Sequence, residues 1–431
     1  MSNKNQFALT PPMGWNSWDC YGASVCEKEV RANAEYMAKN LKQYGWEYVV
    51  VDIQWYEPNA AGTLYNNLAK LCMDEYGRLI PAPNRFPSSA GGKGFAPLAD
   101  YIHSLGLKMG IHVMRGIPRQ AVYADCPVKG TKYTARDIAD GGSICSWNTD
   151  MYGVIDSEGG QAYYDSIIQM YADWGIDFIK VDDMNGFSFM GSRFYHKEAE
   201  MIRRAIDKTG RPIVFSISPR THSTESAELL IKNANMWRIS DDFWDNWDSL
   251  KKMHDLLHMW NPYMGNGHFP DADMLPIGRL SVRSNDPNNR PRYTNLTRDE
   301  QYFMMSLWSI ARSPLILGCE LTELDDFSLS LITNTDMIAL NQHSTNNRMI
   351  YRCDKWSVWA AEYGNDCVFV GFFNFSDQAC AASVLFSDIG IQGRYSAVDV
   401  WSRRSYGICD ELVAVKLNPH QGTLIKLTRE M

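Results

Sequence analysis

The chain has 431 residues, of which 45% are hydrophobic and 21% are charged, and its 31 Gly and 18 Pro residues are ordinary for a globular protein. This composition excludes a disordered scaffold and a fibrous repeat. The 42 Lys and Arg residues are outnumbered by 50 Asp and Glu residues, and the net charge of -8 leaves no basic excess to hold a phosphate backbone, so we expect no nucleic-acid partner. The length predicts two or three domains, or one large barrel with an appendage.

The N-terminal segment lacks the features of a targeting sequence. It reads MSNKNQFALTPPMGW, with one early Lys and none of the apolar run that a secretory signal carries. No stretch approaches the roughly 20 apolar residues that span a bilayer. The cysteines, at 20, 26, 72, 126, 145, 319, 353, 367, 380 and 409, form no CxxC pair and have no nearby His at zinc spacing. We expect a cytoplasmic protein with reduced thiols and no membrane partner.

Short apolar runs alternate with longer helical patterns from residue 10 to about 320, as in βα units around a parallel sheet. The predicted strands lie at 13–18, 48–52, 108–114, 177–183, 212–218, 234–240, near 262–270 and at 313–318. Helical patterns, with apolar residues at i, i+3 and i+4, lie at 27–45, 159–175, 193–210 and 297–313. The repeated units predict an α/β fold, a (β/α)8 TIM barrel. An open doubly wound sheet is the alternative, but no GxGxxG follows an early strand.

The pattern changes after about residue 340. Runs such as DCVFVGFFNFS and YSAVDVWS alternate or nearly alternate, are separated by turn residues and leave no room for helices. We predict a C-terminal antiparallel β-sandwich domain over 339–431 that follows a catalytic barrel over 1–338. The segment 115–158 is too long for a plain connection between two barrel strands, so we expect it to shape the site.

Acidic residues close the predicted barrel strands, where barrel enzymes place their working side chains. They are Asp52, Asp182, Asp183, Asp241, Asp242, Asp271 and Asp273. Several carboxylates at one barrel mouth, with no His triad, favour either a metal site or the two-carboxylate chemistry of glycoside hydrolysis. The metal site is the weaker interpretation because Lys180 and Arg238 would compete with a metal ion for the same carboxylates. We therefore expect no catalytic metal.

Retaining glycoside hydrolysis needs one carboxylate as nucleophile and a second, about 5–5.5 Å away, that first donates and then removes a proton. In IKVDD, side-chain alternation puts Lys180 and Asp182 on one face of the strand, so the cation can keep the carboxylate ionised. Arg238 lies four residues before Asp242, where the strand gives way to a loop. Periodicity leaves open whether Asp241 or Asp242 points inward.

Six motifs follow one another over residues 10 to about 320: PPMGWNSWDCYG, YVVVDIQW, LKMGIH, DFIKVDD, WRISDD and PDADMLPIG. In this order and spacing they resemble the motifs of glycoside hydrolase family 27, the family of α-galactosidases, α-N-acetylgalactosaminidases and β-L-arabinopyranosidases. The resemblance implies a retaining exo-glycosidase without a cofactor, acting on a small oligosaccharide or glycoside. Such an enzyme hydrolyses terminal α-D-galactosides, β-L-arabinopyranosides or both through a glycosyl-enzyme intermediate.

The resemblance also assigns roles to residues of this chain. It makes Asp182 the nucleophile and Asp242, rather than Asp241, the acid/base. The sugar contacts that it implies are Trp18, Asp52, His112, Lys180, Arg238 and Asp273, with His112 standing where the family usually has Tyr. The structural alternatives are an ion pair or strand cap for Asp182, a loop carboxylate or helix cap for Asp242, core packing for Trp18 and His112, a salt bridge for Arg238 and a turn for Asp273.

Ile53 departs from the family pattern. Most members carry two successive aspartates after this strand, and the second one holds the C6 hydroxymethyl group of galactose. Losing a charge-assisted hydrogen bond of about 1.5–3 kcal/mol lowers the preference for that group by roughly 10- to 100-fold. β-L-Arabinopyranose is α-D-galactopyranose with the hydroxymethyl group replaced by hydrogen. We therefore expect β-L-arabinopyranosides to be substrates alongside, or ahead of, α-galactosides.

Two further positions bear on specificity and compartment. Ser218 stands near the place where family members discriminate at the sugar 2-position, and a small residue there leaves room for an acetamido group, although Arg220 or Thr221 can fill that space. The α-N-acetylgalactosaminidase activity is thus an alternative to the two activities named above. Secreted members often have a disulfide-forming Cys two residues after the nucleophile, and this chain has Met184, which favours a reducing compartment. The competing classes are a catalytically silent sugar-binding barrel and a metal-dependent lyase or isomerase.

Overall fold

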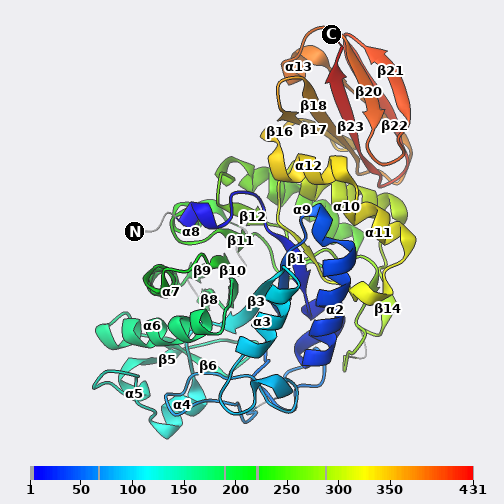
Figure 1. Cartoon of the computed structure of the whole chain (residues 1–431). Coiled ribbons are helices and arrows are strands. Elements are labelled where there is room, and N and C mark those ends of the chain that lie inside the picture. Colours follow the sequence, from blue (N-terminus) through cyan, green and yellow to red (C-terminus); the bar gives the residue numbers. More distant parts are fainter. Residues whose placement is uncertain (1–3, 67, 189–190, 220–222, 287–288, 431) are drawn as a thin grey trace.

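The computed structural model describes residues 4–430 apart from 67, 189–190, 220–222 and 287–288. Its N-terminal part is a curled parallel sheet surrounded by helices (Figure 1). The eight strands follow the order β12-β11-β10-β7-β3-β2-β1-β15. They are β1 (Met13–Asn16), β2 (Tyr48–Val51), β3 (Lys108–Met114), β7 (Phe178–Asp182), β10 (Val214–Ile217), β11 (Met236–Arg238), β12 (Phe269–Asp271) and β15 (Leu315–Leu317). A parallel bridge between Leu275 and Leu317 closes the barrel, and the predicted fold class is confirmed.

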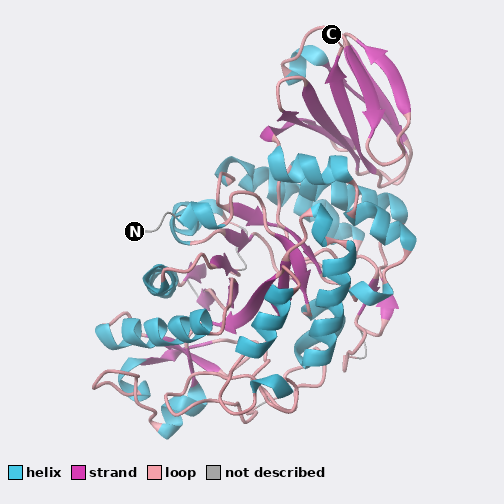
Figure 2. Cartoon of the chain, viewed as in Figure 1, coloured by secondary structure: helices cyan, strands magenta, loops and turns pink. Residues whose placement is uncertain are grey.

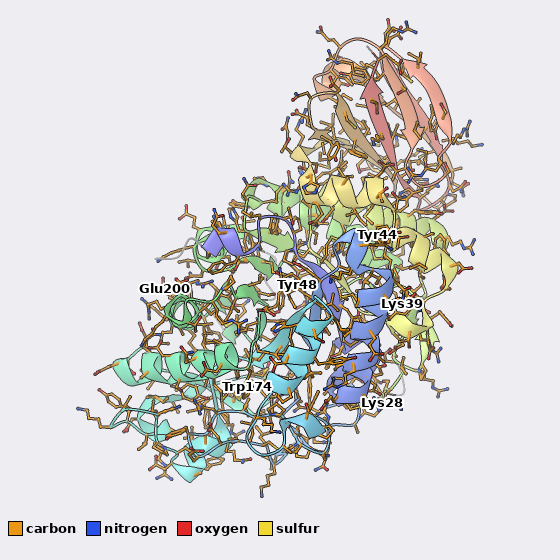
Figure 3. The ribbon with its side chains drawn as sticks, in the orientation of Figure 1. Lys28, Lys39, Tyr44, Tyr48, Trp174 and Glu200 are labelled. Carbon is orange, nitrogen blue, oxygen red and sulfur yellow. The ribbon has the colours of Figure 1, made fainter. Side chains whose placement is uncertain are left out.

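Helices cover the outside of the sheet, and Figure 2 shows them as a layer around the strands. They are α2 (Glu27–Asn40), α3 (Ala96–Ser104), α6 (Glu158–Asp173), α7 (His196–Thr209), α8 (Ala227–Asn233), α9 (Trp247–Trp260), α10 (Arg298–Ile310), α11 (Asp326–Ile332) and α12 (Thr335–His343). The exposed Lys28 and Lys39 lie toward the two ends of α2 (Figure 3). The helix predicted over 27–45 ends at Asn40 because a 3-10 turn follows and Gly45 takes φ 95°.

Of the predicted strands, only 108–114 agrees with the structure at both ends, and two of the differences have a clear cause. The strand predicted at 13–18 ends at Asn16, because the short helix α1 (Trp18–Tyr21) begins directly after it. The strand predicted near 262–270 is confined to Phe269–Asp271, since a 3-10 turn occupies the residues 261–263. The first difference lies at the C-terminal end of its strand, and the second lies in the loop before its strand. The regular apolar pattern stops in both places.

The segment 115–158 forms a small subdomain beside the barrel. It contains β4 (Ile117–Pro118), α4 (Arg119–Ala124), α5 (Ala135–Ile138), β5 (Ala139–Ile144) and β6 (Met151–Val154). Its strands form a three-stranded sheet in the order β4-β6-β5. The other short barrel elements are the hairpin β8 (Asn185–Ser188) with β9 (Gly191–Phe194) and the pair β13 (Arg279–Leu280) with β14 (Arg292–Tyr293).

The C-terminal part is an antiparallel β domain. A six-stranded sheet, in the order β16-β17-β18-β23-β20-β21, packs against the pair β19 and β22 over an apolar core of its own. The elements are β16 (Thr345–Arg352), β17 (Trp356–Tyr363), β18 (Cys367–Asn374), β19 (Cys380–Leu385), α13 (Phe386–Ile389), β20 (Tyr395–Asp399), β21 (Ser405–Cys409), β22 (Leu412–Leu417) and β23 (Gly422–Arg429). The predicted division between residues 338 and 339 falls inside α12, and the first β-domain strand begins at Thr345.

His254 of α9 is fully buried where the barrel meets the β domain. Its Nε2 accepts a hydrogen bond from Trp359 Nε1 at 3.0 Å and lies 2.8 Å from Ser357 Oγ. Its Nδ1 lies 2.9 Å from Nη1 of Arg352 and 3.4 Å from the Asp255 carboxylate. Burial lowers the pKa of His254 to about 4, against the pull of Asp255. The joint between the two parts therefore holds a neutral imidazole.

Two further features concern the described chain as a whole. Within the residues that the structure describes, no helix is long and apolar enough to cross a membrane. All ten cysteines are free thiols.

Candidate active site

A cavity of about 220 Å³ lies at the C-terminal ends of the barrel strands. Sites for drug-sized ligands measure roughly 300–1,000 Å³, so this cavity suits a single sugar ring. It is lined by Trp18, Asp52, Ile53, Thr63, Tyr65, His112, Trp147, Lys180, Asp182, Ser218, Arg238, Ser240, Asp242 and Met274. The structure thus brings together every site residue predicted from the sequence except Asp273, which lies directly behind Arg238.

Strand alternation explains why these side chains meet. The apolar cluster inside the barrel includes Val50, Phe178 and Met236, and each of these residues lies two positions before a polar one on the same strand face. The polar residues are Asp52, Lys180 and Arg238, and Asp182 is one more step of two along β7. The same periodicity that fills the barrel with apolar side chains therefore lines its mouth with charges.

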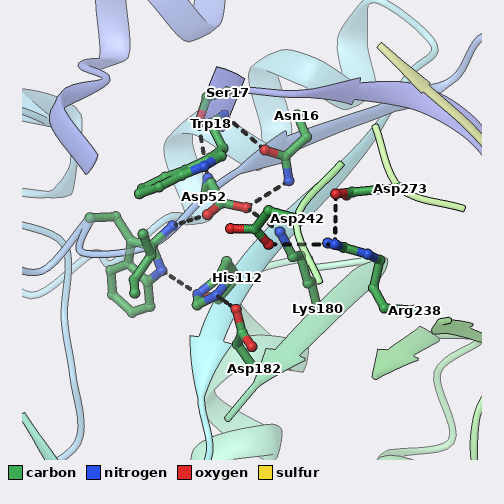
Figure 4. Close-up of polar contacts among 12 residues, drawn as sticks. Asn16, Ser17, Trp18, Asp52, His112, Lys180, Asp182, Arg238, Asp242 and Asp273 are labelled. Carbon is green, nitrogen blue, oxygen red and sulfur yellow. Dashed lines mark hydrogen bonds and ion pairs between the residues drawn. The ribbon is translucent and has the colours of Figure 1, made fainter. Parts of the chain in front are cut away.

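Asp52 and Lys180 form an ion pair in the lining of the cavity (Figure 4). Nζ of Lys180 donates to Oδ2 of Asp52 at 2.9 Å, and Nδ2 of Asn16 donates to the same oxygen at 2.8 Å. Oδ1 of Asp52 accepts a hydrogen bond from the backbone N–H of Ile53 at 2.8 Å. Burial raises the pKa of Asp52, but Lys180, His112 and these donors outweigh it, and the pKa lies well below its usual value. Both groups are therefore ionised. Burial lowers the pKa of Lys180, but the charges of Asp52, Asp182 and Asp273 outweigh it and leave the pKa raised.

Asp182 ends β7 and faces His112 of β3. Nε2 of His112 lies 3.3 Å from Oδ2 of Asp182, and the backbone N–H of Asp183 donates to Oδ1 at 2.7 Å. Burial raises the pKa of Asp182, but His112, Lys180 and the Asp183 N–H more than offset this effect, so the pKa is lowered. The result is a partly exposed carboxylate that is ionised and held at both oxygens.

Arg238 of β11 lies between two carboxylates. Its Nη2 is 2.6 Å from Oδ2 of Asp273 and 3.4 Å from Oδ1 of Asp242. The Asp273 side chain is 3% exposed and that of Asp242 is 60% exposed, so Asp273 anchors the guanidinium while Asp242 remains accessible. Burial raises the pKa of Asp273 against the charge of Arg238, and the neighbouring Asp242 and Asp271 add to the rise. Asp241 is exposed and lies outside the cavity lining.

Ile53 and Ser218 lie where the sequence predicted specificity-determining residues. The Ile53 side chain is buried and gives one part of the cavity wall an apolar surface. Ser218 also lines the cavity, and its buried Oγ has no hydrogen-bond partner among the described residues. Arg220 and Thr221, the alternatives to Ser218, lie outside the described residues.

Five lining residues were not identified from the sequence: Thr63, Tyr65, Trp147, Ser240 and Met274. Tyr65 stacks on Trp18 at a ring-centroid distance of 6.0 Å, and Trp147 packs against Tyr65 at 5.7 Å. Trp147 belongs to the segment 115–158, whose predicted role in shaping the site agrees with this placement. The only signals in the sequence for this contact were the length of the segment 115–158 and the presence of an aromatic residue in it.

Three residues near the strand ends have left-handed backbone conformations, which non-glycine residues adopt at a cost. Gln54 has φ 60°, Asp183 has φ 58° and Asp273 has φ 80°. Each lies within two residues of a charged residue that ends or follows a barrel strand. The surrounding contacts must therefore hold the backbone in place at these positions.

A second, more open cavity of about 350 Å³ adjoins the first. It is lined by Trp18, Thr63, Asp242, Trp244, Asp286, Asn289 and Arg292. Trp18, Thr63 and Asp242 line both cavities. Asp242 therefore stands at the passage from the inner cavity to the outer one.

The charges of the inner cavity are paired with one another. Asp52 pairs with Lys180, and Asp273 pairs with Arg238. Across the described part of the chain, no group of three or more His, Cys, Asp and Glu side chains has the arrangement that holds a metal ion.

Family comparison agrees with both parts of the fold. The family described as Alpha galactosidase A matches residues 10–156 and 150–343, and the family of alpha-galactosidase C-terminal β-sandwich domains matches residues 353–427. An α-galactosidase of Cyamopsis tetragonoloba is 28% identical over 99% of this chain and 88% of its own length.

Solved structures include closer relatives. A family 27 β-L-arabinopyranosidase from Geobacillus stearothermophilus is 52% identical, with a TM-score of 0.97 over 99% of this chain and 98% of that chain. A further structure of that enzyme contains arabinose. A protein of Bacillus halodurans described as a putative α-N-acetylgalactosaminidase is 48% identical, with a TM-score of 0.89 over 98% of each chain.

Proposed function

Because the chain belongs to glycoside hydrolase family 27, we propose that it is a retaining exo-glycosidase whose preferred substrates are β-L-arabinopyranosides, with α-D-galactosides as weaker substrates. The observation that carries this preference is the buried Ile53 in the wall of the sugar cavity. A hydroxymethyl group on C5 would meet an alkyl side chain there and find no charged acceptor. A hydrogen at C5 leaves no polar group unpaired.

In this proposal Asp182 is the nucleophile. Its ionised carboxylate attacks the anomeric carbon, and the bond from that carbon to the leaving-group oxygen breaks as the covalent glycosyl-enzyme forms. His112 and Lys180, which lower the pKa of Asp182, keep the attacking oxygens unprotonated. Lys180 and Asp52 offer a donor and an acceptor to the hydroxyl groups of the sugar.

Asp242 is the acid/base. It donates a proton to the leaving-group oxygen in the first step, and in the second step it takes a proton from the water that attacks the anomeric carbon. Its place between the inner and outer cavities supports this role, because the leaving group occupies the outer side of the scissile bond. Nη2 of Arg238, at 3.4 Å, forms an ion pair with its carboxylate.

An α-N-acetylgalactosaminidase is the second candidate function. Ser218 supports it, since a small side chain with a free buried hydroxyl leaves room and one hydrogen-bond donor for an acetamido group. The Bacillus halodurans relative carries a description of this kind. The ten free cysteines support a reducing, cytoplasmic location for the enzyme.

The test is a kinetic comparison of three p-nitrophenyl glycosides in EDTA: the β-L-arabinopyranoside, the α-D-galactoside and the α-N-acetylgalactosaminide. We expect the highest kcat/KM for the arabinopyranoside. A galactoside preference above about 100-fold would rule out the proposed specificity, and the highest rate on the third substrate would establish the second candidate. Asp182→Ala supplies the control for mechanism, because azide should restore its activity and give a glycosyl azide of inverted anomeric configuration. A silent sugar-binding barrel would hydrolyse none of the three.

A further inference from the structure

A buried ion cluster lies directly behind Asp182, outside the cavity lining. Arg115 follows β3, is 1% exposed and lies between the carboxylates of Asp183 and Glu198, each of which is 6% exposed. Its Nη2 is 2.8 Å from Oδ2 of Asp183, and its Nη1 is 2.6 Å from Oε1 of Glu198. None of the three lines the sugar cavity, so none can contact the substrate ring.

Arg115 holds residue 183 at more than one point. Besides the side-chain ion pair, Nε of Arg115 donates to the backbone carbonyl of Asp183 at 2.8 Å. The backbone N–H of Arg115 donates to the carbonyl of Asp182 at 3.0 Å. These three contacts fix the peptide units on both sides of Asp183, which has the left-handed φ of 58°.

The far side of Arg115 is equally well anchored. Glu198 of α7 also accepts hydrogen bonds from the Tyr164 hydroxyl of α6 and from the backbone N–H of Val154 in β6. The guanidinium lies 3.8 Å from the ring centroid of Tyr195. The cluster therefore ties the 115–158 subdomain and two outer helices to the end of β7.

The peptide unit between Asp182 and Asp183 has a direct consequence for the nucleophile. Its carbonyl accepts the hydrogen bond from the Arg115 N–H, and its N–H donates to Oδ1 of Asp182 at 2.7 Å. Oδ2, the oxygen that faces His112, is then the one left for the anomeric carbon. If this peptide unit rotated, the N–H would point elsewhere, and the carboxylate would lose both a donor and a rotational restraint.

We propose that Arg115 and Asp183 are positioning residues for the nucleophile: Arg115 holds the two peptide units that flank Asp183 so that the Asp183 N–H keeps Asp182 ionised and oriented. This inference rests on the proposed function, in which Asp182 attacks the sugar. It assigns to the pair an effect on the chemical step and not on substrate binding.

The decisive variants are Asp183→Ala and Asp183→Asn. Alanine has neither the ion-pair partner nor tolerance of a left-handed φ, whereas asparagine adopts that conformation readily and still offers Arg115 an oxygen. We expect Asp183→Ala to lower kcat by about 10- to 100-fold with KM within about threefold, and to move the acid limb of the kcat/KM profile to higher pH. Asp183→Asn should stay within about threefold of wild type in kcat and keep the wild-type limb.

Glu198→Gln is the matched structural control, because it alters the same buried cluster without touching residue 183. It should lower the melting temperature and leave the acid limb unchanged.

Should Asp183→Ala fail to fold, Asp183→Gly takes its place, since glycine accepts the backbone conformation and loses only the side-chain anchor. For this variant we expect kcat to be lowered by about three- to tenfold, and the acid limb of the kcat/KM profile to move to higher pH, as for Asp183→Ala. Among the described residues, the other groups that face Asp182, namely His112, Lys180, Arg238 and Tyr65, are unchanged in all variants.

The outcomes separate the two proposals. If the Asp183 variants lose thermal stability but keep the wild-type kcat and acid limb, the cluster is only structural and the inference is wrong. Asp182→Ala, assayed in parallel, tests the underlying function. Full activity in Asp182→Ala would overturn the proposed mechanism, whereas an inactive Asp182→Ala beside unaffected Asp183 variants would overturn the positioning role alone.

Discussion

Nζ of Lys180 lies 2.9 Å from Oδ2 of Asp52, so a cation from β7 and a carboxylate from the end of β2 meet across the intervening strand β3. The pair is buried and receives a further hydrogen bond from Asn16. A substrate hydroxyl therefore enters a polar network whose members hold one another in place. Such preorganisation reduces the cost of ordering the site when substrate binds.

Lys180→Met should therefore damage both stability and activity. Asp52 would be left as a buried, unpaired carboxylate, and breaking such a pair costs about 3–5 kcal/mol in the free energy of unfolding. We expect kcat/KM to fall by at least about 100-fold. The double variant Lys180→Met with Asp52→Asn should recover much of the stability in urea unfolding, but not the activity. Equal losses of stability in the single and double variants would contradict this account.

Ile53→Asp should shift substrate preference. A carboxylate at this position offers the C6 hydroxymethyl group a charge-assisted hydrogen bond of about 1.5–3 kcal/mol. The ratio of kcat/KM for the α-D-galactoside to that for the β-L-arabinopyranoside should rise by roughly 10- to 100-fold. Ile53→Leu is the control, because it keeps an apolar wall and should leave the ratio within about threefold of wild type. A ratio that does not respond to the carboxylate would remove Ile53 as the determinant.

Trp147→Ala should weaken substrate binding. The indole completes an aromatic wall with Tyr65 and Trp18, and removing a stacking partner of this kind costs about 0.5–1.5 kcal/mol. We expect KM to rise by roughly 2- to 10-fold for both glycosides, with kcat changed less. Tyr123→Ala is a suitable comparison, since Tyr123 lies in the same subdomain but is 63% exposed. If the two variants give the same KM, the subdomain does not take part in sugar binding.

The stability of the enzyme should fall as the pH drops from about 6.5 toward 4. Burial lowers the pKa of His254 to about 4, whereas an unfolded histidine titrates near 6.5. Between these values the unfolded state binds the extra proton, so the contribution of the neutral ring is present above pH 6.5 and is lost on acidification, by about 3 kcal/mol at most. Asp255, Arg352 and His258 face the ring: Asp255 opposes the lowering of the pKa, whereas Arg352 and His258 add to it.

The measurement is urea unfolding at several pH values for wild type and His254→Gln. The variant should show a weaker dependence on pH across this range, while His343→Gln, an exposed control at the end of α12, should follow the wild type. An unchanged slope for His254→Gln would show that the buried imidazole is not the group responsible.

The sequence predicted best those residues that lie on the strands. Lys180 and Asp182 were placed on one face of their strand by two-residue alternation, which buried parallel strands obey strictly. Beyond the last strand residue that periodicity ends, and for this reason it left Asp241 and Asp242 undecided. The structure places Asp242 at the cavity and Asp241 outside its lining.

Loop residues were beyond the reach of such patterns. Tyr65 and Trp147 come from long connections, where neither helical nor strand spacing indicates which way a side chain points. Asp273 was predicted as a sugar contact, and it lies behind Arg238 because the backbone turns back at φ 80°. Its role at the sugar remains a prediction. Arg115 was not identified from the sequence, because its ion pairs are with Glu198 and Asp183, which are distant from it along the chain.

The residues 6–13 before and at the start of β1 border a hollow together with Tyr48 and Lys108, the first residues of β2 and β3. The beginning of the chain thus lies under the barrel, at the opposite end from the mouth that receives the sugar. Enzyme tethered to a bead through a linker at this end would present its catalytic opening to the surrounding liquid, and neighbouring molecules on the support would not block one another's substrates.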